Sequence, residues 1–169
     1  MQFRAILGAV LFVFFSNSMG SARGDALSDC ASHIPWGAPT ITDGANLDLV
    51  CHGGYLSALD VHAKVPRWVA YELTGPHTLG CFPRTGLQFK VDPLAPAEDQ
   101  GRLVDYKNSG YDLGHMAPNQ DFAWSKAEQR ESFSFVNVAP QLPGLNRQGW
   151  ERGEEFVRAW ANERGDLEV

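Results

Sequence analysis

The longest apolar run in the chain lies at its amino terminus. Residues 5–15 are all apolar, and one cation, Arg4, precedes them. Small and polar residues fill positions 16–22, with a spacing suited to signal cleavage. The run is too short for a membrane-spanning helix, which needs roughly 20 residues. We therefore expect residues 1–22 to be the signal peptide of a periplasmic or secreted protein, with no membrane anchor in its mature form.

Two stretches in the first half of the chain alternate apolar and polar residues and predict strands. They are residues 54–61 and residues 68–74, and the second ends at the turn formers Gly75 and Pro76. We expect the two strands to pair antiparallel. Ahead of them, residues 23–50 are rich in proline, glycine and aspartate, which predicts an irregular lead-in to one domain over residues 51–169.

The second half of the chain alternates between strand and helix patterns. Residues 94–101 are rich in proline, alanine and acidic residues, which predicts a surface loop. In residues 146–164 apolar side chains recur at helical spacing, with Arg and Glu between them. The other expected elements are a helix around residues 123–129, a strand over residues 133–139 and the beginning of a strand at residues 167–169.

The three cysteines suggest one disulfide. Cys30 and Cys51 flank a segment rich in proline and glycine, and in an exported protein we expect them to pair. Cys81 is then left over, either as an inert thiol or with a partner outside this sequence. No two cysteines are close enough in sequence for a zinc knuckle.

The net charge of the chain limits the ways in which it could bind a nucleic acid. A length of 169 residues suits one domain with a real core, and the formal net charge is −6. Cleavage of the signal peptide removes one cation, Arg4, and leaves −7. This balance argues against a broad basic binding face, but it allows an enzyme that meets phosphates locally through a divalent cation and a few arginines.

One histidine, His115, stands in the most distinctive stretch, residues 110–121. A carboxylate, Asp112, precedes it by three positions, and Gly114 is its neighbour. An imidazole titrates near neutral pH, which suits a general base. Gly114 allows either an unusual backbone angle or a close approach by a substrate. Taken alone, however, a histidine beside apolar residues is more often packed than catalytic.

A second polar group lies at the start of the expected long helix. Asn146, Trp150 and Glu154 are spaced by four residues, which places them on adjoining parts of one helical face. Amide and carboxylate oxygens suit Mg²⁺, which keeps most of its waters and can be held by one direct protein ligand. The alternative is structural, because Asn is a favoured N-cap and Glu154 would be a solvated helix residue. Taken alone, this segment favours the structural alternative.

Together the two groups resemble the DNA/RNA non-specific endonucleases, a family of ββα-metal (His-Me finger) nucleases that includes the endonuclease G type. Residues 112–118 are similar to the family's Asp-Arg-Gly-His signature. The second block matches in residue types and spacing: Asn137 to Gln141, Leu145, Asn146, Trp150 and Glu154. The resemblance spans about residues 50–164 and implies an α+β fold with a ββα-metal finger inserted in a mixed, mainly antiparallel sheet.

The resemblance also implies roles for five residues. His115 would be the general base that activates water, and Asn146 would be the direct ligand of one Mg²⁺, with Mn²⁺ as a second candidate. Glu154 would hold water of the metal's hydration shell, and Asn137 would help to position the site. Arg84 matches the family's phosphate-binding arginine. The implied activity is hydrolysis of phosphodiester bonds in DNA and RNA, whatever their sequence, leaving 5′-phosphates.

Two departures from the family pattern support an alternative. Leu113 stands where the family usually has arginine, which removes a positive charge near the phosphates. The family domain also continues past its long helix into further strands, so we expect this chain to be truncated at its C-terminus relative to a complete domain. The alternative is an inactive relative that binds nucleic acid or a partner, although such a module need not retain His115, Asn146, Glu154 and Arg84. A purely structural disulfide domain leaves these groups unexplained.

Overall fold

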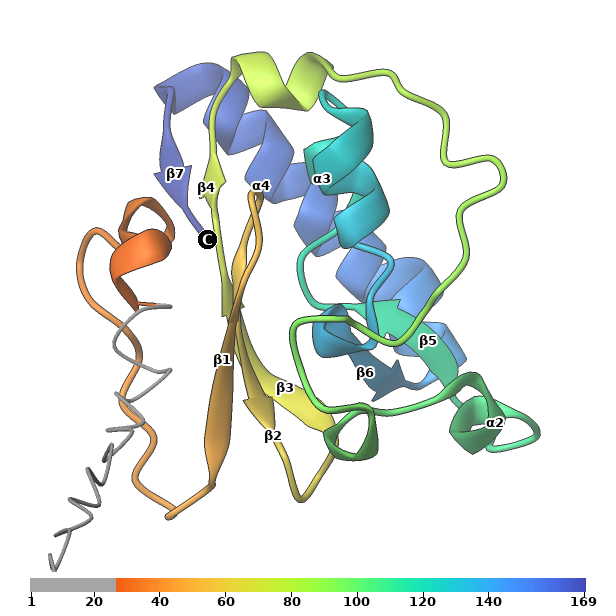
Figure 1. Ribbon diagram of the computed structural model, residues 1–169. Coiled ribbons are helices and arrows are strands. Elements are labelled where there is room, and N and C mark those ends of the chain that lie inside the picture. Colours follow the sequence, from red (N-terminus) through yellow and green to blue (C-terminus); the bar gives the residue numbers. More distant parts are fainter. Residues whose placement is uncertain (1–26) are drawn as a thin grey trace, which may run out of the picture.

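The computed structural model describes residues 27–169, so the predicted signal peptide lies outside the described residues. Three antiparallel strands form a sheet in the order β1 (Leu47–Cys51), β2 (Leu56–Asp60) and β3 (Val65–Ala70). The predicted antiparallel pair in this part of the chain is therefore confirmed as β2 and β3. Figure 1 shows the lead-in on one side of this sheet and the helices on the other.

The core lies where β2 meets the helical side of the sheet. β2 is buried at every position, and its Ser57 hydroxyl donates a hydrogen bond to the carbonyl of Val136. Burial of apolar surface is the main force that holds such elements together. The buried core cluster comprises Val50, Tyr55, Leu59, Tyr71, Leu73, Ala117, Phe122, Val136 and Ala161.

The long helix and the last strand close one end of this core. A π-helical stretch, Leu145–Trp150, continues into α4 (Glu151–Arg164), which agrees with the helix expected from the sequence. Gly165 ends α4 with a φ of 96°, a backbone angle that favours glycine. The chain then forms β7 (Leu167–Glu168), which pairs antiparallel with β4 (Glu72–Leu73). The predicted C-terminal strand is thus confirmed.

A second antiparallel pair carries the distinctive histidine. β5 (Asp112–His115) pairs with β6 (Val138–Gln141), with His115 opposite Val138. These strands precede α4 and form with it the ββα unit that the resemblance implied (Figure 1). The strand predicted over residues 133–139 is wrong in its first half, because residues 135–137 form a helical turn capped by the Ser134 hydroxyl.

Short helices and turns fill the connections. Helix α2 (Leu103–Tyr106) precedes β5, and α3 (Lys126–Glu131) follows it, starting later than the helix expected around residues 123–129. Single turns of 3₁₀ helix span Ala31–His33, Pro76–Leu79, Ala97–Asp99 and Asn119–Phe122. Within residues 27–169, no helix combines the length and apolar character needed to cross a membrane.

The disulfide ties the lead-in to the sheet. Cys30 and Cys51 are bonded, with their Cα atoms 5.8 Å apart, as predicted. Cys81 is a free, exposed thiol. The lead-in is irregular apart from short helical turns until it enters β1 at Leu47, so its last few residues are strand rather than loop.

Candidate active site

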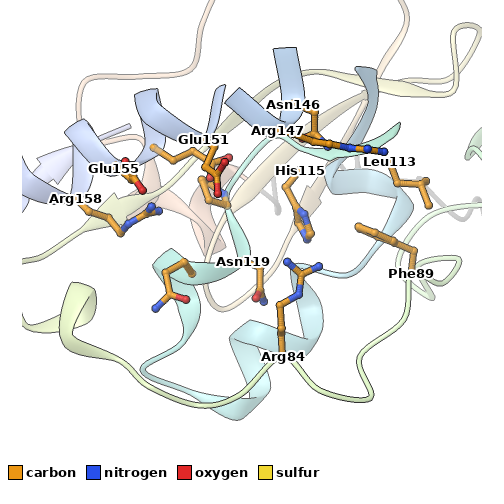
Figure 2. Close-up of a pocket in the computed structure, with 13 residues that line it drawn as sticks. Arg84, Phe89, Leu113, His115, Asn119, Asn146, Arg147, Glu151, Glu155 and Arg158 are labelled. Carbon is orange, nitrogen blue, oxygen red and sulfur yellow. The ribbon is translucent and has the colours of Figure 1, made fainter. Parts of the chain in front are cut away.

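A cavity of about 420 Å³ opens between β5, α4 and the loop that carries Arg84. Four of the five predicted site residues line it: His115, Asn146, Glu154 and Arg84. Figure 2 shows the His115 imidazole between the Arg84 side chain and the segment that holds Asn146 and Arg147. The fold therefore brings two sequence blocks that are far apart in the chain into one pocket.

His115 ends β5, and its neighbour Gly114 is needed for a close contact. A Cβ added to Gly114 would lie 2.1 Å from the side-chain carboxamide carbon of Gln141 on β6. Any larger residue would force the Gln141 side chain to move. A close approach at Gly114 is thus made by Gln141.

The imidazole of His115 is packed among aromatic rings. The ring centroids of Phe89 and Phe133 each lie 4.9 Å from the centroid of the imidazole, and Phe133 meets it edge-on. Its Nε2 is buried and has no hydrogen-bond partner within residues 27–169. Buried polar atoms are nearly always paired, so an unpaired one points to a partner supplied from outside the protein. Burial first, and then the positive charge of Arg84, lower the pKa of His115 to about 3.

This low pKa gives a test of the site's electrostatics. We expect the imidazole to stay neutral from pH 8 down to about pH 4, although an imidazole in water titrates near pH 6.5. The Arg84→Ala substitution removes a repulsive positive charge, so it should raise the pKa of His115. A titration of the histidine side-chain ¹⁵N shifts by NMR measures both values. An unchanged pKa in Arg84→Ala would show that the two groups are not electrostatically coupled.

Asn137 lies behind the site and braces it. Its side chain is fully buried, accepts a hydrogen bond from the backbone N–H of Ala117, and donates to the carbonyls of Ala117 and Ser132. The backbone carbonyl of Asn137 also accepts from the N–H of Met116. These contacts hold the segment that follows His115. Asn137 does not line the cavity, so it can act on the site only through position.

Asn146 is held by a carboxylate on β5 and does not cap the helix. Its Nδ2 donates to Asp112 at 3.1 Å, and the N-cap position belongs to Gly144, which makes no side-chain capping bond. The structural alternative for Asn146 is therefore wrong. Because its N–H group is engaged with Asp112, the carbonyl oxygen of Asn146 is left as the group that can meet a ligand in the cavity.

Arg147 completes this contact with two further bonds. Its Nε and Nη2 donate to the two oxygens of Asp112 at 2.7 and 2.6 Å, a bidentate pair. The hydrogen bonds from Arg147 first, and then from Asn146, hold the pKa of Asp112 below its usual range. Arg147 is otherwise exposed in the cavity. The chain thus has a cation in this wall beside the uncharged Leu113.

The π-helical stretch decides which side chains of the long helix face the cavity. A π-helix bonds residue i to i+5 rather than i+4, so the spacing of residues on one face widens. Asn146 and Glu154 both line the cavity, but Trp150 faces a neighbouring pocket with Trp68 and Val157. Glu154 also lines that neighbouring pocket, so the three side chains lie on adjoining parts of one face, as predicted, with Trp150 turned toward the second pocket.

Two charged residues of α4 form the cavity's other end. Glu154 is half-buried, and burial raises its pKa to about 7, while the nearby Arg158 opposes this shift. Arg158 donates to the buried carboxylate of Asp121 at 2.9 Å, and the hydroxyl of Tyr71 donates to the other oxygen at 2.7 Å. This network fixes α4 against the segment that follows His115. A cation bound beside Glu154 would lower the pKa of its carboxyl group and favour the ionised form.

The loop that presents Arg84 is anchored at both ends. At its start, a Cβ on Gly80 would lie 2.1 Å from the backbone nitrogen of Trp124, so only glycine fits. At its end, the buried Asp92 accepts hydrogen bonds from His52 at 2.8 Å and from Ser134. Arg84 itself is exposed, with its guanidinium 5.5 Å from the centre of the Phe133 ring. Its charge is therefore free to meet an anion.

The donor groups in the cavity fit a divalent cation with few protein ligands. The carbonyl oxygen of Asn146 and the carboxyl group of Glu154 are hard donors, and Glu151 and Glu155 also line the cavity. No cluster of three or more His, Cys, Asp or Glu side chains forms a metal cage in the described part of the chain. Mg²⁺ suits such a site, because it keeps several waters and needs only one or two protein ligands.

Several residues of the site escaped the sequence reasoning. Arg147 and Arg158 carried a weak signal, since each lies close in sequence to a predicted site residue, Asn146 or Glu154. The pairing of Arg147 with Asp112 joins residues 35 positions apart and depends on the fold. Nothing in the sequence around Phe89 indicated that its ring packs against the imidazole of His115.

Comparisons with known proteins point to one family. Residues 38–169 match the family model described as DNA/RNA non-specific endonuclease. Human mitochondrial endonuclease G is 30% identical over 105 residues, covering 62% of this chain and 35% of the relative. The mitochondrial nuclease of Saccharomyces cerevisiae is 34% identical over 114 residues, covering 66% and 34%. Nuclease C1 of Cunninghamella echinulata is 30% identical over 129 residues, covering 75% and 51%.

A solved structure is also similar. The EndoG/EndoGI complex, whose description refers to inhibition of EndoG, contains a chain that matches with a TM-score of 0.74 and 27% identity. The match covers 82% of this chain and 56% of that one. This chain thus spans about a third of the length of the human and yeast relatives and about half of nuclease C1.

Proposed function

This chain belongs to the DNA/RNA non-specific endonuclease family, and we propose that it hydrolyses phosphodiester bonds of DNA and RNA with the aid of a divalent cation. The observation that carries the proposal is that His115 lines one cavity together with arginines and with the oxygen donors Asn146 and Glu154. A neutral nitrogen beside a phosphate-sized cavity is the arrangement that a general base requires.

In this proposal His115 accepts the proton of the attacking water. Its low pKa keeps the lone pair available at neutral pH. A phosphate that binds near Arg84 offsets the positive charge that depresses this pKa, and so makes the imidazole more basic when the substrate is present. The water oxygen forms a bond to phosphorus, and the bond from phosphorus to the 3′-oxygen breaks. The leaving 3′-oxygen takes a proton from solvent water, so the products are a 5′-phosphate and a 3′-hydroxyl.

The remaining groups bind and orient the phosphate. Arg84, Arg147 and Arg158 supply positive charge from three sides of the cavity, where it can offset charge that develops on the phosphate oxygens. Asn146, held by Asp112, and Glu154 would hold Mg²⁺ or Mn²⁺. When bound, the cation adds positive charge beside the phosphate and the leaving oxygen. Contacts of this kind address the backbone, which agrees with cleavage at any sequence.

The test is cleavage of plasmid DNA and of a long RNA in the presence and absence of a divalent cation. We expect fragments with Mg²⁺ and none when EDTA is in excess. The ends should carry 5′-phosphates, which a ligase assay detects. Mg²⁺-dependent binding without any cleavage would instead support the inactive relative. Cleavage that persists in EDTA would contradict the proposed role of the cation.

We also propose that the protein is exported to the periplasm or the medium. The support is the apolar amino-terminal run of residues 5–15 together with the disulfide between Cys30 and Cys51, a bond that persists mainly in oxidising compartments. Several relatives are mitochondrial by name. Mass spectrometry of the protein isolated from its native host without reductant tests this proposal. An intact residue 1–22 segment and reduced cysteines would contradict it.

A further inference from the structure

A second hollow, of about 690 Å³, lies beside the active-site cavity, and Leu113 lines both. Helix α2 supplies one wall with Leu103 and Val104, which are 62% and 63% exposed. The residue before β5, Tyr111, supplies another wall and is 48% exposed. Exposed apolar side chains gathered around one hollow can form a binding surface.

We propose that this hollow receives an unstacked nucleobase of a single-stranded substrate. The base would belong to a nucleotide next to the phosphate bound in the active-site cavity. The inference rests on the proposed function and adds to it a subsite and a substrate class. It makes Tyr111 and Leu113 binding residues for the base, while Arg84 and Arg147 bind the backbone.

The chemistry of the walls fits a flat, largely apolar ring. A half-exposed tyrosine ring can stack on any base, because every base has a π-face. Leu113 offers an apolar contact at the boundary of the two cavities, beside the ion pair of Asp112 and Arg147. The walls of the hollow are mostly apolar or aromatic, which agrees with a contact that tolerates every sequence.

The charges around the hollow also favour a nucleotide. The carboxylate of Asp112, which lines the hollow, is already engaged by Arg147 and Asn146, so its charge is largely offset there. Lys107 also lines the hollow, is exposed, and forms no salt bridge within residues 27–169. Its ammonium group is therefore available to a neighbouring phosphate. An apolar protein segment would gain nothing from this cation.

The shape of the site favours a single strand over a duplex. A base in a duplex is stacked and paired, and it must be extruded before it can enter a side pocket. In a single strand the bases are already free to splay, and aromatic side chains commonly hold them in this way. We therefore expect tighter binding of single strands than of duplexes of the same length.

Fluorescence anisotropy in EDTA tests this proposal without any cleavage. The probes are a short labelled single strand, the duplex of the same sequence, and a strand of the same length that carries abasic sites. The proteins are the wild type, Tyr111→Ala and Tyr111→Phe, with Trp36→Ala as a control for loss of an exposed aromatic outside the hollow. Because Tyr111 is half-exposed, its replacement should leave the fold intact, which a thermal melt checks.

We expect Tyr111→Ala to weaken binding of the base-bearing strand by about 5- to 100-fold. Tyr111→Phe should restore it, Trp36→Ala should leave it unchanged, and the abasic strand should bind all four proteins equally. Equal affinity of the wild type for base-bearing and abasic strands would overturn the proposal. A change in oligomeric state by light scattering in Tyr111→Ala, with strand affinity unaltered, would also overturn it and assign the hollow to a second copy of the chain.

The outcome is separable from that of the proposed function. If the wild type cleaves plasmid DNA with Mg²⁺ but binds base-bearing and abasic strands equally, the subsite fails and the nuclease stands. If it binds single strands through Tyr111 and cleaves nothing, the nuclease fails and the subsite stands.

Discussion

The His115→Ala substitution is expected to lower the rate of plasmid cleavage by about 10²- to 10⁴-fold, the range for loss of a general base. The reason is the position of His115 in the cavity. Within residues 27–169, His115 is the histidine that lines the cavity. A gel or fluorescence assay under single-turnover conditions measures the rate directly. Because the substitution should not remove the phosphate-binding arginines, affinity for DNA measured in EDTA should change little.

Two further variants guard this result. The imidazole packs between Phe89 and Phe133, so alanine leaves a void that could loosen the site. His115→Gln fills much of this space and should be as inactive as alanine. His62→Ala removes an exposed histidine in the turn after β2 and should cleave at the rate of the wild type. Undiminished cleavage by a folded His115→Ala protein would exclude His115 as the base.

The Asn146→Ala substitution is expected to act on the cation. It removes the carbonyl oxygen available in the cavity, so the apparent affinity for Mg²⁺ or Mn²⁺ should fall by at least about 10- to 100-fold, and cleavage should fall with it. Titration of cleavage against cation concentration measures this affinity, and calorimetry with Mn²⁺ measures it without a substrate.

The contact with Asp112 sharpens this prediction. In Asn146→Asp the new carboxylate would face Asp112 in place of the donated hydrogen bond, so this variant should not rescue cation binding. Gln148→Ala is a matched control, because it removes an exposed amide two positions further along the same π-helical stretch and outside the cavity. If Asn146→Ala bound Mn²⁺ as tightly as the control, Asn146 could not be the ligand.

The sequence was sufficient for features that depend on neighbouring residues. Alternation of apolar residues identified β2 and β3, and helical periodicity identified α4. The pairing of Cys30 with Cys51 was predicted from the segment rich in proline and glycine that they flank, together with the expectation that the protein is exported. Each of these signals depends on neighbouring residues or on composition, so it can be read from a single sequence.

Features that depend on contacts between distant segments were missed or misread. Asn146 looked like an N-cap because its partner, Asp112, lies 34 positions away and reaches it only through the β5–β6 pair. The pattern of apolar residues also gave no sign that the helix begins with a π-helical stretch, Leu145–Trp150. The strand expected at Phe133 failed because Ser134 caps a helical turn instead. Only the Asn146 contact joins distant segments; the π-helix and the Ser134 cap are local features that the pattern of apolar residues does not distinguish.

The most direct test of the site is a double-mutant cycle on Mg²⁺-dependent cleavage. It compares the wild type with His115→Ala, Asn146→Ala and the double variant under one set of conditions. If the base and the cation ligand act on the same phosphate, the losses should be strongly non-additive, and the double variant should cleave about as slowly as the slower single variant. Losses that multiply would show that His115 and Asn146 act independently and would contradict a single catalytic site between them.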